Sequence, residues 1–298
     1  MRQQPDTGQR RPARRRGGGL RIWVLLAFIA YGAWYWYSNQ SVDPVTGESV
    51  LIDRNLSADD EKALGLEAYQ QIMQQERWVD PDATISREIR NIAERLVAKV
   101  EVVEAALAAE HGMAPTRFSA DFDWEVNVID SDQANAFALP GGKMAVYTGL
   151  VPVAQNEDAM AVVMGHEIAH AVLRHGAQRM AQQRLSQIGQ AAGAFSGMDP
   201  QQQQMVMAAM GYGYLLPYAR KHETEADEVG LMLAAAACFD PRESVPLWQR
   251  MGQGGGEAPP EFASTHPSSA TRIAHLESLM PKALEYRERF CEAGPLRS

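Results

Sequence analysis

An apolar run from Ile22 to Tyr37, placed directly after an Arg-rich tail, is the feature that most constrains how this chain can fold. Sixteen residues in a helix rise about 24 Å, slightly less than the ~30 Å hydrocarbon core of a bilayer. Four aromatic residues from Trp34 to Tyr37 close the run, as in the aromatic belt at a membrane surface. We therefore predict one transmembrane helix over 22–38, which holds the chain in a lipid bilayer.

The tail, residues 1–21, contains seven Arg and one Asp, together with Gln, Pro and Gly, and is predicted to be disordered. Basic residues before a span stay in the cytoplasm, so the body of the chain should lie across the membrane. A cleaved signal peptide is the alternative, but no A-x-A site follows the run and no Cys there could take a lipid. A buried core helix is disfavoured by the seven Arg.

The rest of the chain is acidic, with 21 Lys and Arg against 36 Asp and Glu. A nucleic-acid partner needs a basic face, so this balance argues against one. Apolar residues make up 46% of the sequence, enough for a substantial core. The two cysteines, Cys238 and Cys291, could pair in an oxidising compartment or remain separate thiols.

A polar linker is expected over 39–56, followed by one domain over 57–298. Ser57 and Asp60 form a capping box that opens a helix to about Gln75. Apolar residues at i, i+4 and i+7 spacing predict a second helix of six turns over 85–107.

Strands are predicted in the middle of the chain. Apolar and polar residues alternate over 122–130, which indicates a half-buried strand. The segments 136–139 and 143–148 flank Pro140-Gly141-Gly142, which is typical of a hairpin turn. Beyond Gly149 the chain is predicted to be helical, weakly patterned over 177–211 and with a flexible Gly-rich loop at 252–260. The fold class is α+β, a small sheet with many helices.

The segment His166-Glu167-Ile168-Ala169-His170 carries the chemistry. Asn156 can cap a helix that places the two histidines one turn apart on one face, where both imidazoles can bind one Zn²⁺. Glu167 is rotated by about 100° from His166, so it addresses a water at the metal and acts as general base. The alternative is a buried helix with two satisfied histidines.

A catalytic zinc needs a third protein ligand. Arg220 opens a second helix, on which Glu223 and Asp227 lie one turn apart, while Glu225 is rotated by about 200° and should point away. That face offers one carboxylate to the metal and a second to orient a His N–H. An ordinary charged first turn is the alternative.

Together these motifs resemble the zinc metallopeptidases that include HtpX, BepA and the CAAX prenyl endopeptidases. The resemblance runs from about Leu56 to Leu276 and is closest to single-anchor bacterial periplasmic members and their mitochondrial inner-membrane relatives. Its pieces are Asn135-Ala136-Phe137-Ala138-Leu139-Pro140-Gly141-Gly142, Tyr147-Thr148-Gly149-Leu150, Gly165 to His170 with Arg174-His175, Glu223-x-x-Ala226-Asp227, Thr265-His266-Pro267 and Arg272-Ile273. Two departures are Cys238, where Gly is expected, and the variable stretch 177–211.

The resemblance implies a gluzincin-like domain with one Zn²⁺ per chain, held by His166, His170 and Glu223. Asp227 is implied to orient a ligand histidine by accepting its N–H. His266 is implied to be a fourth, blocking ligand or a loop His that caps a helix. Arg272 is implied to stabilise the oxyanion or to pair with an acid. The edge strand is implied to bind the substrate backbone through Asn135, Ala136, Phe137, Ala138 and Leu139.

We therefore expect a zinc endopeptidase of the bacterial inner membrane, with its catalytic domain in the periplasm and with misfolded or misassembled envelope proteins as substrates. An intramembrane protease is disfavoured, because only seven apolar residues, 159–165, precede the motif. A zinc-stabilised chaperone or assembly factor is the alternative, and the intact Glu167 argues against it.

Overall fold

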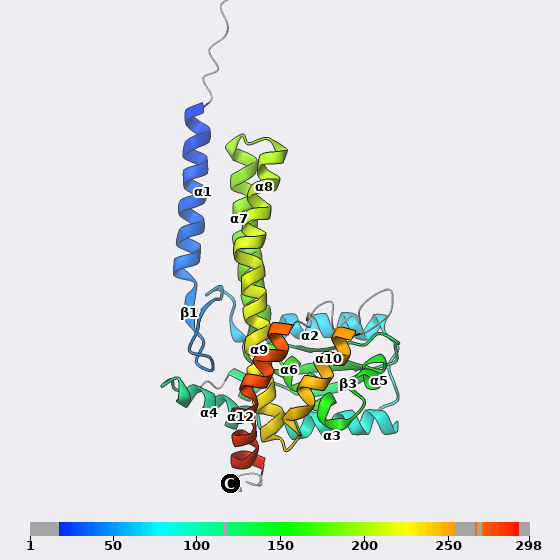
Figure 1. The fold of residues 1–298 in the computed structure, drawn as a ribbon. Coiled ribbons are helices and arrows are strands. Elements are labelled where there is room, and N and C mark those ends of the chain that lie inside the picture. The colour runs from blue at the N-terminus through cyan, green and yellow to red at the C-terminus, as the bar shows by residue number, and fades with distance from the viewer. Residues whose placement is uncertain (1–17, 116–117, 254–265, 267–269, 292–298) are drawn as a thin grey trace, which may run out of the picture.

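A computed structural model describes residues 18–115, 118–253, 266 and 270–291. The segment 1–17, the loop residues 254–260, and Thr265 and Pro267 of the predicted motif lie outside the described residues. The molecule has a body of helices around a small sheet and an arm of long helices that extends from it (Figure 1). The predicted α+β class is confirmed.

The predicted membrane span falls within helix α1 (Gly18–Ser38). This helix lies along α7 (His175–Ser196), where the ring of Phe28 stacks on that of Phe195 at 5.7 Å. Within the described ranges, no helix combines the length and apolar character that crossing a membrane requires. The span over 22–38 therefore stays a prediction.

The segment expected to be a linker forms a hairpin of strands β1 (Gln40–Val42) and β2 (Ser49–Leu51). Val50 packs against Ala177 of α7, and the Leu51 N–H donates to the Tyr218 hydroxyl at 3.1 Å. The hairpin thus ties α1 to the body and to the base of the arm.

Three helices follow, of which α2 (Ala58–Gln75) begins at the predicted capping box of Ser57 and Asp60. The helix expected over 85–107 is two, α3 (Thr84–Val97) and α4 (Val100–Glu110). The apolar spacing continues in step across the short break, so the pattern could not reveal it. Both helices bury their apolar face in the main core.

The sheet has the order β3 (Glu125–Ile129), β5 (Lys143–Tyr147), β4 (Ala136–Leu139). The predicted hairpin is confirmed, because β4 and β5 are antiparallel with Leu139 opposite Lys143. β3 runs parallel to β5, which is buried along its whole length. β4 is an edge strand and lies against α6 (Glu157–Val172).

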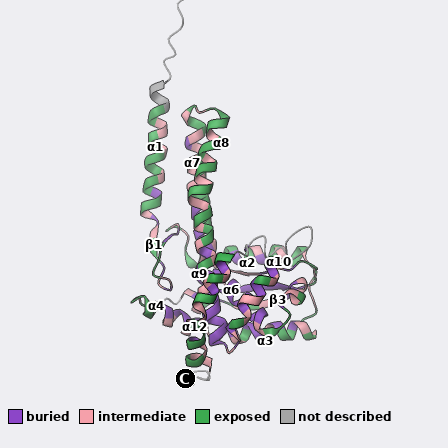
Figure 2. Ribbon diagram, in the orientation of Figure 1, coloured by how far each residue is buried: buried purple, intermediate pink, exposed green. Residues whose placement is uncertain are grey.

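Two helices, α6 and α9 (Leu216–Ala236), cross at the centre of the core (Figure 2). They meet at Gly165 and Gly230, so closely that a Cβ on Gly230 would lie 2.6 Å from the backbone nitrogen of His166. A Cβ on Gly165 would lie 2.8 Å from the Gly230 carbonyl oxygen. A side chain at either position would push the two helices apart.

The stretch 177–211 forms most of the arm. α7 leads away from the body, and α8 (Pro200–Met210) and the π-helix η3 (Gly211–Leu215) lead back into α9. The outer half of the arm is largely exposed (Figure 2). α9 thus begins at Leu216, before the predicted start at Arg220. The remaining elements are η1 (Phe118–Asp121), η2 (Thr148–Leu150), α5 (Val151–Ala154), η4 (Pro241–Glu243), α10 (Ser244–Gln253) and α12 (Ala270–Cys291).

A disulfide joins Cys238, just after α9, to Cys291 at the end of α12. Cys238 has φ of 71°, the left-handed conformation for which Gly is expected.

Replacing both cysteines by Ser is expected to lower the free energy of unfolding by roughly 4 kcal/mol, because the bond closes a long loop in the unfolded chain. Urea unfolding of the oxidised protein and of the Cys238→Ser, Cys291→Ser variant measures the difference. Two alkylatable thiols in unreduced protein taken from the oxidising side would contradict the bond.

Candidate metal centre

Helix α6 places the two histidines of the predicted motif together. The Asn156 side chain accepts from the Ala159 N–H and starts the helix, as predicted. One turn apart on this helix, the Nε2 atoms of His166 and His170 lie 3.1 Å from each other. Both rings are almost fully buried. Two imidazole nitrogens therefore face one common point.

Helix α9 adds a carboxylate at that point. Glu223 Oε2 lies 3.5 Å from His166 Nε2, and Glu223 Oε1 lies 3.5 Å from His170 Nε2. Burial by itself would raise the pKa of Glu223, but the neighbouring His166 and His266 hold that pKa well below its ordinary value. An anionic carboxylate between imidazoles is the arrangement that a divalent cation stabilises.

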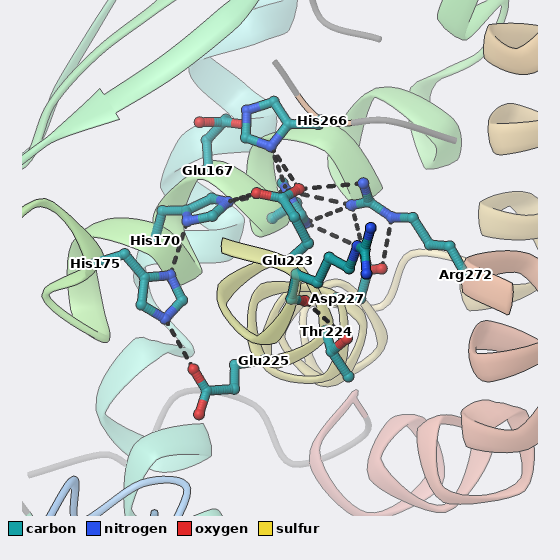
Figure 3. A network of polar contacts seen from close by, with 11 residues as sticks. Glu167, His170, His175, Glu223, Thr224, Glu225, Asp227, His266 and Arg272 are labelled. Atoms are coloured by element: carbon teal, nitrogen blue, oxygen red, sulfur yellow. Dashed lines mark hydrogen bonds and ion pairs between the residues drawn. The ribbon is translucent and has the colours of Figure 1, made fainter. Parts of the chain in front are cut away.

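His266 completes the group. Its Nδ1 lies 2.7 Å from Glu223 Oε2 (Figure 3). The same atom lies 3.2 Å from His166 Nε2. One ligand atom from each of His166, His170, Glu223 and His266 lies within 4.8 Å of the others. Three imidazoles and one carboxylate are a donor set that suits Zn²⁺, so the residues fit the predicted metal.

Two further predicted residues, Asp227 and Arg272, contact the ligand residues of this cluster. Asp227 Oδ1 lies 3.1 Å from His166 Nδ1, on the side of the ring away from the cluster. The guanidinium of Arg272 donates to both oxygens of Asp227 at 2.6 Å, and its Nη1 donates to Glu223 Oε2 at 3.2 Å. It also stacks 3.4 Å from the ring of Trp248. Arg272 was expected either to stabilise the oxyanion or to pair with an acid, and in the structure it pairs with Asp227 and Glu223.

Glu167 lies on the other side of the cluster from Asp227 (Figure 3). It is 5% exposed, and burial raises the pKa of its carboxyl. Its Oε1 has no hydrogen-bond partner among the described residues and lies 3.6 Å from His266 Nε2. A buried carboxylate oxygen that accepts no hydrogen bond, next to a metal-ligand cluster, is available to take a proton.

The strand expected to bind substrate is close to this helix. β4, with Ala136, Phe137, Ala138 and Leu139, lies against α6 at the edge of the sheet. Asn135, just before it, uses its side-chain oxygen to accept from the Ala136 N–H. The main chain of β4 is therefore next to the helix that carries the motif.

Two polar residues near the cluster, His175 and Glu225, are not among the site residues that the sequence predicts, and Glu225 is expected to point away from the metal. In the structure His175 lies between His170 and Glu225, in hydrogen-bond distance of both. The five-residue step from His170 to His175 fits no single helix face, so only the turn at Arg174 (φ of 56°) brings the rings together.

The sequence of this chain is similar to those of known proteins. A model of Peptidase family M48 matches residues 96–280. The chain is 35% identical to "Mitochondrial metalloendopeptidase OMA1" of Schizosaccharomyces pombe, over 89% of this chain and 74% of that protein. It is 31% identical to human "Metalloendopeptidase OMA1, mitochondrial", over 93% of this chain and 52% of that protein. "Beta-barrel assembly-enhancing protease" of Yersinia pestis is 27% identical over 74% of this chain and 43% of its own length.

The chain belongs to Peptidase family M48. It is a zinc metalloendopeptidase, which agrees with the predicted family, enzyme class and cofactor.

Proposed function

We propose that this chain is a membrane-anchored endopeptidase that removes misfolded or misassembled envelope proteins. In this proposal His166, His170 and Glu223 hold zinc and Glu167 is the general base. The observation that carries the proposal is the buried Glu167 Oε1, which accepts no hydrogen bond from the described residues and lies beside the ligand cluster. A site that only stabilised the fold would need no such base.

The chemistry follows from these placements. Zinc, when bound, acidifies a water molecule and polarises a peptide carbonyl. Glu167 takes the proton of the attacking water and returns it to the leaving amine. Asp227 accepts from His166 Nδ1–H and so directs Nε2 of that ring to the cluster. Arg272 holds Asp227 and Glu223 in place by ion pairs.

Edge strand β4 supports a sequence-tolerant substrate preference. An extended peptide can add to a sheet edge by main-chain hydrogen bonds, which do not depend on its side chains. Unfolded segments of envelope proteins provide such peptides. A comparison of envelope proteins that accumulate in wild-type cells and in Glu167→Gln cells tests the proposal. If the same proteins accumulate in both, the quality-control role is wrong.

For the anchor, we propose that α1 spans a bacterial inner membrane, with the body in the periplasm. The basic tail before it and its exposed apolar side chains, such as Trp23 and Ile29, support this topology. The related proteins include both mitochondrial and bacterial examples.

A periplasmic reporter fused after Ser38 is expected to be active and a cytoplasmic reporter silent, because the Arg-rich tail stays inside. The full-length chain should remain with membranes after a carbonate wash, and a variant that lacks 22–38 serves as the control. A shortened soluble form in both wild-type and Glu167→Gln cells would instead support a cleaved signal peptide.

His266 is proposed to restrain the resting enzyme as a fourth ligand. Its Nδ1 lies within the cluster, at 2.7 Å from Glu223. Catalysis needs one open position at zinc, so occupation of that position by an imidazole blocks it.

His266→Ala is therefore expected to raise proteolysis or self-cleavage with zinc retained, measured as peptide turnover per zinc. If His266 instead donates to the oxyanion, the same change lowers the rate by about 10²–10³-fold. A rate equal to that of the wild type would exclude both roles.

A further inference from the structure

The two ligand histidines on α6 have different partners behind them. His166 has the carboxylate of Asp227 at Nδ1, at 3.1 Å. At His170 the corresponding partner is an imidazole, because Nδ1 of His175 lies 2.8 Å from Nδ1 of His170. A carboxylate follows only beyond that ring, where Glu225 Oε2 lies 3.2 Å from His175 Nε2 (Figure 3).

We propose that His175 and Glu225 are positioning residues that fix the ring and the tautomer of His170 for zinc. The proposal rests on the proposed role of His170 as a ligand, and it gives a role to two residues outside the His166–His170 segment and the ligand set. Outer partners of a ligand histidine orient its ring and raise its basicity.

The hydrogen positions follow from the three contacts. His170 Nε2 faces the cluster, so its Nδ1 carries the hydrogen and donates to Nδ1 of His175. His175 then carries its hydrogen on Nε2 and donates it to the carboxylate of Glu225.

These contacts form a relay from His170 through His175 to Glu225, and its middle ring, His175, is held rigidly. His175 is fully buried and stacks on His222, with ring centroids 4.1 Å apart and planes inclined by 17°. His222 Nε2 lies 3.0 Å from Oε1 of Gln178, whose side-chain nitrogen donates to the Leu173 carbonyl. His175 cannot rotate without breaking this stack, so it can define the orientation of His170.

The relay also joins the elements that form the site. His170 belongs to α6, His175 is the first residue of α7, and Glu225 belongs to α9, only two residues after Glu223. Helix α9 thereby supports the ligand His170 through Glu225 and supplies the ligand Glu223 from a different face.

Zinc affinity of the full-length protein, measured by competition with a chelator, tests the relay. His175→Phe keeps a flat ring against His222 but removes both nitrogens, and Glu225→Ala removes the final acceptor. Each change is expected to weaken zinc binding by about 10–100-fold. Because the two residues act in series, the double variant should be little weaker than His175→Phe alone.

Two matched variants separate positioning from packing. Glu225→Gln keeps an oxygen that can accept from His175, and its zinc affinity should stay near that of the wild type. His222→Phe changes the stacked neighbour without changing the relay and should behave likewise. Long-range ¹H–¹⁵N correlation spectra should show a single Nδ1–H tautomer for His170 in metal-free wild type and a mixture in His175→Phe.

Unchanged zinc affinity in a folded His175→Phe protein, or an equal loss in His222→Phe, would overturn the proposal. If His175→Phe does not fold, Glu225→Ala decides the matter in the same assay. The measured quantity is zinc binding, so an absence of proteolysis would count against the proposed function and not against the relay. Unchanged zinc affinity would leave the role of Glu167 intact.

Discussion

Replacement of Glu167 by Gln is expected to leave one zinc per chain and to remove nearly all peptide hydrolysis. The amide cannot take the proton of the attacking water, and general-base catalysis alone contributes about 10²–10⁴-fold. The ligand side chains are unchanged, so the metal should stay. Elemental analysis and turnover of an unfolded protein substrate measure the two quantities on the same preparation.

Glu157→Gln is the matched control, because Glu157 lies on the same helix but is exposed and pairs with Arg95 at the surface. It should retain full activity. Hydrolysis by Glu167→Gln at the wild-type rate, with zinc present, would show that another group is the base.

Glu223→Ala is expected to lose zinc, and all hydrolysis with it. The change leaves the imidazoles of the cluster without the only carboxylate among the four grouped residues, within the described part of the chain. It also removes the ion pair between the guanidinium of Arg272 and the carboxylate at position 223. The zinc content after dialysis against a weak chelator measures the effect.

Glu228→Ala is the control on the same helix, since Glu228 is partly exposed and pairs with Lys282. It should keep its zinc. Glu225→Ala should weaken binding less than Glu223→Ala does. Normal zinc binding in Glu223→Ala together with its loss in Glu225→Ala would show that the ligand assignment is wrong.

Local signals in the sequence predict local structure well here. The Ser57 capping box, the Asn156 cap and the hairpin at Pro140-Gly141-Gly142 each depend on a few neighbouring residues, and all three are confirmed. The break between α3 and α4 was missed, because the apolar spacing remains in step across it.

The ligand residues of the metal cluster could be predicted, because each belongs to a short local motif. His166 and His170 are placed by their spacing, and Glu223 by a second motif. The relay through His175 to Glu225 could not be predicted, because it depends on the left-handed turn at Arg174 and on where α9 crosses α6. The 53-residue separation of Cys238 and Cys291 likewise gives no information about distance in the fold.

The glycine contact between α6 and α9 has a consequence for how such a protein can diverge. Since the two helices meet backbone to backbone at Gly165 and Gly230, the distance between their ligands is set at the crossing and not by the chain that connects them. Insertions or deletions in the outer arm, beyond Gln182, would leave the metal geometry in place. The outer arm can therefore vary in length without altering the distance between the ligands on α6 and α9.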